Sequence, residues 1–292
     1  PFDVQGSLHA LGTEFDSVRF LQGFAGQWRG LSISGGDTSL LQYTRISGTN
    51  RLGGDIRSIQ GGLRVQSGIG THNGDVFTAD TVRLGMVHCV VSGNRSRSQN
   101  AGIGVAAARL TMISCIVRDN AVGGGSRYGR GGGVSIQGGV SRLTDCIIER
   151  NVARSDAGLV YEHPLGLQSQ LPLIMERCVV RENTGEWSGG VDVRIKIFAC
   201  LAFGPCPPEP DSFAVVIEEC LIANNAGGGL SFGGEQVNAS VDHCTITDNT
   251  YSSQYGVGGG LAGGRATVDV ENSIVWGNSP SDIIPGTAYE GD

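Results

Sequence analysis

Acidic side chains recur at one position of a repeated phrase, and carboxylates in such a row could bind cations. Each lies two residues before a cysteine, or before the serine that replaces it: Glu176, Glu218, Asp242 and Glu271. Carboxylate oxygens are the ligands that Ca²⁺ prefers, so Ca²⁺ is the cofactor that this stripe could hold. A solvated acidic face explains the row more simply, and we predict no metal site and no required cofactor.

Two histidines are further candidates for chemistry because each directly precedes a cysteine of the phrase. His88 and His243 are separated by most of the repeats, so they cannot act together on one substrate. We interpret both as surface residues rather than as general bases.

The phrase that contains these residues returns seven times and ends in asparagine each time. It begins with cysteine six times and with Ser273 once, and two mostly β-branched or leucine residues follow. Its asparagines are Asn94, Asn120, Asn151, Asn183, Asn225, Asn249 and Asn278. The steps between them are 26, 31, 32, 42, 24 and 29 residues. Internal repeats of this length are typical of a solenoid.

Each repeat contains three short apolar segments. Residues three and five before the cysteine are mostly apolar, as in Leu110 and Met112, and this alternation predicts a half-buried strand. A second strand follows the cysteine, and a third follows a Gly-Gly pair, as in Gly131–Ile136 and Gly189–Val193. The sequence predicts an all-β, single-stranded parallel β-helix of about nine or ten coils, on the order of 45 Å long.

Looser strands are expected in the first third of the chain. They are 15–20, 28–34, 40–46 and 61–65, and Asn50 is a candidate for the first corner asparagine. We expect one domain over residues 1–280, with less regular coils over 1–60, a protruding loop over 198–212 and an irregular tail over 281–292.

Asparagine at a repeated corner has a structural explanation. Stacked amides can hydrogen-bond to their equivalents in the coils above and below, and asparagine tolerates the left-handed backbone that a sharp corner requires. Charges beside it alternate in sign from coil to coil, as in Arg118, Glu149 and Arg181, which favours one strand register.

Composition excludes several classes of protein. Glycine accounts for 48 of the 292 residues and proline for 9, which suits a chain that turns often rather than a disordered tail. The net charge of −7 makes nucleic acid an unlikely partner. The sequence has no apolar run of 18 residues, so we expect no transmembrane helix.

The Gly-Gly-Val/Leu strands and Cys-x-x-x-x-Asn corners resemble the right-handed parallel β-helix proteins of the pectate-lyase-like superfamily. The resemblance covers residues 15–280 and extends to bacterial secreted and surface proteins, including adhesins. It implies the fold more specifically than the function, because this fold supports lyases, hydrolases, adhesins and tail spikes. It also implies a secreted or cell-surface bacterial location.

Enzymes of this group pair a Ca²⁺ site with an Arg or Lys base, or use pairs of aspartates. Arg194-Ile-Lys196 is similar to the tripeptide of polygalacturonase-type hydrolases, and Asp192 lies beside it. The companion motifs Asn-Thr-Asp, Asp-Asp and Gly-His-Gly are absent, so these three residues are candidates without a complete catalytic set.

Six of the eight cysteines occupy the repeated position and are expected to fill the core as free thiols. Disulfides between neighbouring cysteines of this row are the alternative. Cys200 and Cys206 lie in the longest interval between asparagines. We expect a disulfide to close that loop, which would suit an oxidising compartment.

Aromatic residues give the remaining candidates for binding. Five lie in or beside the expected loops, where they could stack on sugars, anchor a protein or cover the core: Tyr128, Tyr161, Trp187, Tyr251 and Tyr255. The sequence favours a non-catalytic structural or adhesive module that binds glycan or a surface protein. Polysaccharide lyase or glycoside hydrolase activity, and end-to-end self-association through exposed strand edges, are the alternatives.

Overall fold

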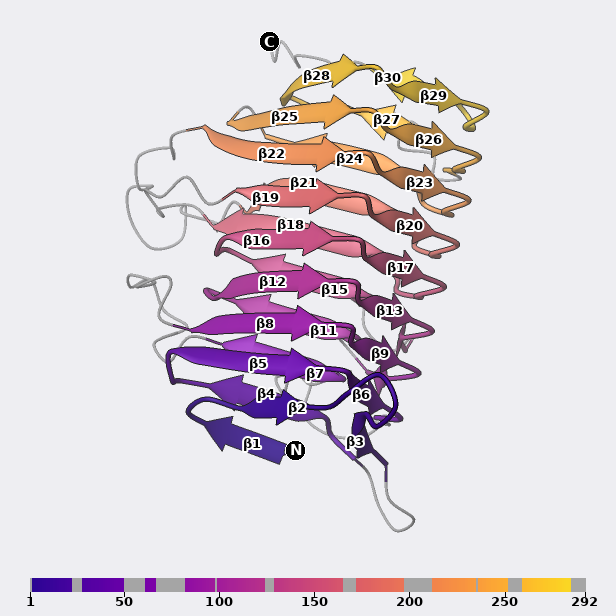
Figure 1. Cartoon of the computed structure of the whole chain (residues 1–292). Coiled ribbons are helices and arrows are strands. Elements are labelled where there is room, and N and C mark those ends of the chain that lie inside the picture. Colours follow the sequence, from indigo (N-terminus) through magenta and orange to yellow (C-terminus); the bar gives the residue numbers. More distant parts are fainter. Residues whose placement is uncertain are drawn as a thin grey trace, which may run out of the picture.

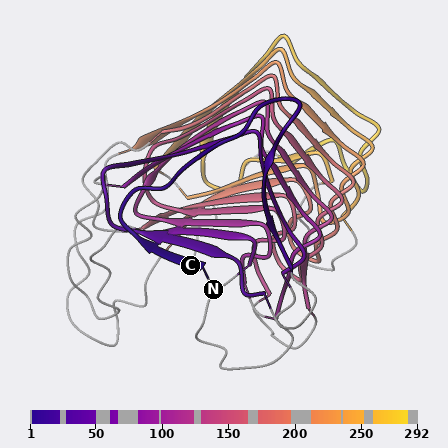
Figure 2. The same cartoon turned by 60° about the horizontal axis from the view of Figure 1, so that its bottom comes forward.

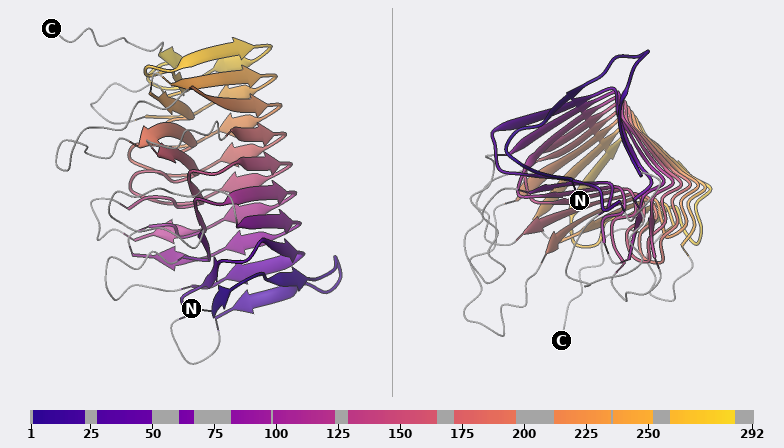
Figure 3. Two further views of the ribbon diagram at one scale, coloured as in Figure 1. Left: turned by 90° about the vertical axis from the view of Figure 1, so that its left-hand side faces the viewer. Right: turned by 90° about the horizontal axis from the view of Figure 1, so that it is seen from below.

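The chain forms a right-handed parallel β-helix of about ten coils (Figure 1). The structure is a computed structural model that describes residues 2–22, 28–49, 61–66, 82–97, 99–123, 129–164, 172–196, 212–234, 236–251 and 259–284. Every regular element within these ranges is a β-strand, so the predicted fold class is confirmed. Viewed towards its end, the stack has three faces, each made by one parallel sheet (Figures 2 and 3).

Each coil contributes one strand to sheet A, then one to sheet B, then one to sheet C. Sheet A contains β1 (Phe2–Gln5), β4 (Leu31–Ser34), β7 (Leu63–Gln66), β11 (Ile103–Ala106), β15 (Val134–Gln137), β18 (Leu159–Pro164), β21 (Val191–Lys196), β24 (Leu230–Gly233), β27 (Leu261–Ala262) and β30 (Ile283–Ile284). Sheet B contains β2 (His9–Leu11), β5 (Thr38–Gln42), β8 (Arg83–Val87), β12 (Arg109–Ile113), β16 (Ser141–Thr144), β19 (Leu173–Glu176), β22 (Phe213–Glu218), β25 (Val237–Asp242) and β28 (Thr267–Glu271).

Sheet C follows the cysteine corner and ends at the asparagine corner. It contains β3 (Val18–Leu21), β6 (Thr44–Ser47), β9 (Val90–Ser92), β13 (Ile116–Arg118), β17 (Ile147–Glu149), β20 (Val179–Arg181), β23 (Leu221–Ala223), β26 (Thr245–Thr247) and β29 (Ile274–Trp276). Two further short strands, β10 (Arg95–Ser96) and β14 (Ala121–Val122), pair just beyond the asparagines.

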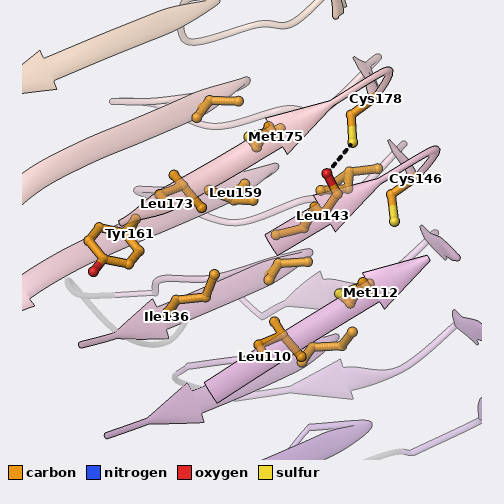
Figure 4. Packing of buried hydrophobic residues seen from close by; sticks show 14 of the residues in the cluster. Leu110, Met112, Ile136, Leu143, Cys146, Leu159, Tyr161, Leu173, Met175 and Cys178 are labelled. Carbon is orange, nitrogen blue, oxygen red and sulfur yellow. Dashed lines mark hydrogen bonds between the residues drawn. The ribbon is translucent and has the colours of Figure 1, made fainter. Parts of the chain in front are cut away.

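The core is a set of columns in which equivalent residues of successive coils lie one above another. Met86 pairs with Met112, Met112 with Leu143, and Leu143 with Met175, and all four are buried. Figure 4 shows the last three. The column five residues before the cysteine is likewise buried from Leu84 to Ala239. The six cysteines of the phrase are buried and free, which confirms their predicted role as small core residues. Neighbouring thiols and burial raise the pKa of Cys115 far above its ordinary value, so this thiol stays protonated.

The asparagines form the predicted ladder. In each of six steps, the side-chain amide nitrogen of one asparagine donates to Oδ1 of the next at 2.9–3.0 Å. The same Oδ1 accepts the backbone N–H of the asparagine below, at 2.9–3.1 Å. Each amide nitrogen also donates to a carbonyl oxygen of the coil below, for example Asn151 to Val117. Buried amides are therefore satisfied within the ladder itself.

The prediction that the asparagines themselves adopt the left-handed conformation was wrong. Positive φ falls on the residue before each asparagine, for example Asp119 at 56° and Arg150 at 51°. A second left-handed column precedes the cysteines, and His88 and His243 are exposed there, as expected for surface residues. The left-handed residue turns the chain at the corner, and the next residue can then direct its amide into the ladder.

Close approach of successive coils explains the glycines before sheet A. A Cβ on Gly190 would lie 2.0 Å from the carbonyl oxygen of Gly229, and one on Gly158 would lie 2.3 Å from that of Gly190. Real Cβ atoms do not approach backbone atoms so closely. The Gly-Gly pair is therefore required by the spacing between coils and not only by turn formation.

The ends of the regular structure differ from the predicted limits. At the first strand of sheet C, β3 begins at Val18, and Phe15 is 96% exposed rather than part of a strand. At the other end, β30 pairs with β27, so the coil continues past residue 280 into the predicted tail. Oδ1 of Asp282 accepts from Asn278 at 3.0 Å and ends the ladder there. Asn50, Cys200, Cys206, residues 198–211 and residues 285–292 lie outside the described residues.

Charges beside the ladder pair between coils much as predicted. Arg181 contacts Glu149 at 2.8 Å, and Arg150 contacts Asp119 at 2.9 Å and Glu182 at 3.8 Å. Glu149 is nearly buried, and although burial opposes its charge, Arg181 and Arg150 hold the pKa of its carboxyl below the usual value. These pairs favour one register between coils.

A test of the ladder is Asn151→Ala. The substitution removes the donor to Asn183 and the acceptor for Asn120, so we expect the free energy of unfolding to fall by about 2–4 kcal/mol in urea denaturation. Asn238→Ala on the exposed face of β25 is the matched control and should cost little. Equal costs for the two variants would contradict a structural role for the ladder.

Candidate functional site

The acidic stripe lies along one face of sheet B as predicted, and two of its four residues have polar partners. Glu176, Glu218, Asp242 and Glu271 lie in register on neighbouring strands of sheet B. Glu176 contacts Arg142 at 2.9 Å, and Asp242 accepts from Asn272 at 2.9 Å. Asn272 and His243 lower the pKa of Asp242, and Asp242 in turn raises the pKa of His243. Within the described part of the chain, no three His, Cys, Asp or Glu residues are grouped as metal ligands.

A different charged group lies on the outer face of sheet A, where β21 carries two of the predicted catalytic candidates. Val191 and Val193 point into the core and are fully buried, so Asp192 and Arg194 point outward from the same strand. Arg194 pairs in register with Glu162 of β18. Because coils stack in parallel, residues from three successive coils meet here. We call Arg130, Asp156, Glu162, Asp192 and Arg194 the outer cluster.

Arg194 is the centre of the outer cluster. Its Nη1 lies 2.7 Å from Oδ2 of Asp192, and its Nη2 lies 2.7 Å from Oδ2 of Asp156. Its Nε lies 3.2 Å from Oε1 of Glu162. Arg130 approaches the same Glu162 oxygen at 2.8 Å, and Gln137 donates to the other oxygen of Glu162 at 3.2 Å. Three carboxyl groups are thus held by two guanidinium groups.

Burial makes this group different from the surface pairs of sheet B. The side chains of Asp156, Glu162 and Asp192 are 1%, 4% and 9% exposed, while that of Arg194 is 23% exposed. Burial raises the pKa of Asp192 to about 7; Arg194 opposes this shift, and Asp156 and Glu162 add to it. Burial also opposes the charge of Arg194, but Asp192 and Asp156 outweigh it and raise the pKa of its guanidinium.

The pKa shifts of Asp192 and Arg194 determine which proton transfers the outer cluster can perform. Arg194 cannot act as a Brønsted base, because its guanidinium binds its proton more tightly than usual. Asp192 can hold or release a proton near neutral pH, as a general acid must. The outer cluster therefore fits acid chemistry at a carboxyl group better than base chemistry at an arginine.

Sequence reasoning found two members of the outer cluster and missed three. Arg130, Glu162 and Arg194 are spaced by 32 residues, which equals the step from Asn151 to Asn183. That spacing was a usable signal that these side chains stack. Asp156 lies between Asn151 and β18 and pairs with Ser188 through an isolated bridge, so no regular strand pattern marked it.

Lys196, the third catalytic candidate, and His163, which the sequence did not single out, lie near the ends of β21 and β18. The backbone of Lys196 ends β21 opposite Pro164, but its side chain lies outside the described part of the structure. His163 points into the core and stacks on Phe213 with ring centroids 4.5 Å apart. Lys196 therefore stays a candidate without a described geometry.

The five aromatic candidates do not form one binding surface. Tyr161 was predicted beside a loop but is fully buried in β18, where its hydroxyl donates to the Gly139 carbonyl at 3.2 Å; that prediction was wrong. Alternation along β18 places Tyr161 on the inner face with Leu159. Tyr251 is half-buried, Trp187 is 63% exposed, and Tyr128 and Tyr255 lie outside the described residues.

Trp187 lies at a corner that the backbone holds firmly. Gly185 donates to Ala226 at 2.8 Å, Glu186 to Arg154 at 2.7 Å and Ser188 to Ser155 at 2.8 Å. The side chains of Glu186 and Arg154 also pair, at 3.0 Å. Val152 on the preceding coil is 45% exposed. We call Arg154, Glu186 and Trp187 the Trp187 patch.

Comparison of the chain with family models, curated proteins and solved structures gave no match. In the described part of the chain, no helix is long and apolar enough to cross a membrane.

Removing the central cation tests whether the outer cluster supports the fold. In Arg194→Met, three buried carboxyl groups keep only Arg130, so we expect the free energy of unfolding to fall by about 3–5 kcal/mol at neutral pH. Arg142→Met removes the exposed pair with Glu176 and should cost only about 0–1 kcal/mol. Urea denaturation of both variants measures the contrast, and similar small losses would show that the outer cluster contributes no more than a surface pair.

Proposed function

We propose that the protein is a non-catalytic structural and adhesive β-helix module that binds glycan or a surface protein through the residues at its corners. The observation that carries this proposal is the exposed indole of Trp187 on a corner fixed by three backbone hydrogen bonds. An exposed aromatic ring has few rotatable bonds, so it loses little entropy when a sugar ring or an apolar side chain stacks on it. The ion pair of Arg154 with Glu186, the residue before Trp187, adds polar groups at the same corner.

The arrangement of the outer cluster supports the same proposal. Its guanidinium groups contact the carboxyl groups of the chain itself, so they are engaged in the fold rather than presented to a charged substrate. The resemblance to the pectate-lyase-like superfamily supports a secreted or cell-surface bacterial location, where rigid β-helices present binding surfaces.

Self-association through the ends is a further part of the proposal. On the last described coil, Ile274, Trp276 and Ile283 are 62%, 72% and 48% exposed, and on the first coil Phe2 and Leu21 are 51% and 46% exposed. Continuing the register of sheets A and C from one copy to the next would place Ile283 beside Phe2 and Trp276 beside Leu21.

The binding proposal is tested by Trp187→Ala on a glycan array and on candidate surface proteins. We expect roughly a two- to tenfold loss of affinity for the bound glycan or protein, because stacking of a ring is worth about 0.5–1.5 kcal/mol. Phe15→Ala is the matched control, because it removes another exposed aromatic ring far along the chain. Unchanged binding by Trp187→Ala would contradict a role for the Trp187 patch.

A glycoside hydrolase is the second candidate, and the protonation of Asp192 favours it. A carboxylic acid that holds its proton near pH 7 is one of the two carboxyl groups that a glycosidase uses. Release of reducing sugars from uronate-containing polysaccharides would support this candidate if Asp192→Asn abolished it while Asp269→Asn did not. Absence of turnover together with glycan binding would support the adhesive module instead.

A further inference from the structure

One carboxylate oxygen of the outer cluster has no hydrogen-bond donor among the described residues. Oδ1 of Asp156 is fully buried without a partner, whereas its Oδ2 accepts from Arg194 at 2.7 Å. Native proteins seldom leave a buried charged oxygen unpaired, because nothing then replaces the water it has lost. A donor is therefore missing at this position.

The net charge of the outer cluster also indicates that one of its groups carries an additional proton. With every group ionised, the three carboxylates and two guanidiniums would leave one negative charge in excess. An uncompensated charge in a buried site is costly, and such sites usually become neutral by binding a proton. One proton would balance the outer cluster.

Asp192 is placed to carry that proton. The carboxyl group of Asp156 is near enough to contribute to the raised pKa of Asp192, and Oδ2 of Asp192 accepts from Arg194 at 2.7 Å. Its Oδ1 is therefore the oxygen available for a proton. We propose that Asp192 is a carboxylic acid at neutral pH, that its Oδ1–H donates to Oδ1 of Asp156, and that this bond is a pH-sensitive clasp between coils.

The groups around Asp192 favour the acid form on balance. Glu162 on β18 and Asp156 before it are like charges, and Arg194 on its own strand is the opposing charge. Arg130 and Gln137, from the preceding coil, contact Glu162 rather than Asp192. On the other side, β24 presents Ser231 in register with Asp192 and Gly233 in register with Arg194, and neither is charged. Burial raises the pKa of Asp192 to about 7 in these surroundings.

The clasp connects three coils because the backbone of Asp156 is shared between them. Its carbonyl accepts from Gly131 and Gly132 at 2.9 and 3.0 Å, and the residue bridges Ser188 of the following coil. Ser188 directly follows Trp187. Loss of the proton would place two carboxylates side by side at this junction and weaken it above neutral pH.

The sign of the pH dependence follows from the raised pKa. Between about pH 4 and 7 the native state holds a proton on Asp192 that the unfolded chain has released, so this contribution to stability falls as pH rises. The stabilisation that the Asp192 proton provides is complete below about pH 4 and is absent once the pH exceeds the pKa of Asp192 in the folded protein, about 7. Asp192→Asn keeps an amide donor for Asp156 and cannot titrate.

The experiment compares urea unfolding of the wild type, Asp192→Asn and the exposed control Asp269→Asn from pH 5 to 9. The ratio of unfolding constants, wild type over Asp192→Asn, should rise by up to about tenfold per pH unit to pH 7 and level off above pH 8. Asp269→Asn should follow the wild type.

Carboxyl ¹³C NMR of the wild-type protein gives a second measurement that does not depend on the folding of a variant. We expect the Asp192 resonance to titrate with a midpoint near pH 7. A midpoint below pH 5, or parallel pH profiles for the wild type and Asp192→Asn, would overturn the proposal. Neither measurement involves ligand binding, so the inference stands or falls separately from the proposed function.

Discussion

The hydrogen bond between stacked asparagine amides is the interaction on which the rest of the structure depends. Each amide joins its own coil to the coils above and below, so the ladder fixes the spacing of the coils at the asparagine corner. A strand register that is fixed at one corner is fixed around the whole coil. The columns of methionine, leucine and cysteine can then stack in the core, and side chains 32 residues apart can meet on the outer face.

The sequence predicted the parts that repeat, and the reason is physical. A solenoid presents the same environment to equivalent residues, so Asn120 and Asn151, or Met86 and Met112, carry the same signal. Tyr161 was misplaced because one aromatic residue beside an expected loop has no repeated partner to show which face it occupies. The left-handed residue was assigned to the asparagine because composition alone does not separate a corner residue from its neighbour.

The candidate site was predicted only in part, because its members come from different positions of the repeat. Asp192 and Arg194 stood out through a local tripeptide, and Glu162 and Arg130 could have been found from the 32-residue step. Asp156 could not, since it lies in an irregular segment and reaches Arg194 only when the coils stack. Burial, which separates this group from the acidic stripe on sheet B, is not visible in the sequence.

The most direct test of the account is hydrogen exchange at the backbone amides of the ladder asparagines, measured by NMR. Each of these amides donates to the next Oδ1, so we expect Asn120, Asn151, Asn183 and Asn225 to exchange at rates set by global unfolding, with faster exchange towards the ends of the stack. Exchange in the central asparagines as rapid as in exposed corner residues would contradict the claim that the ladder holds the coils together.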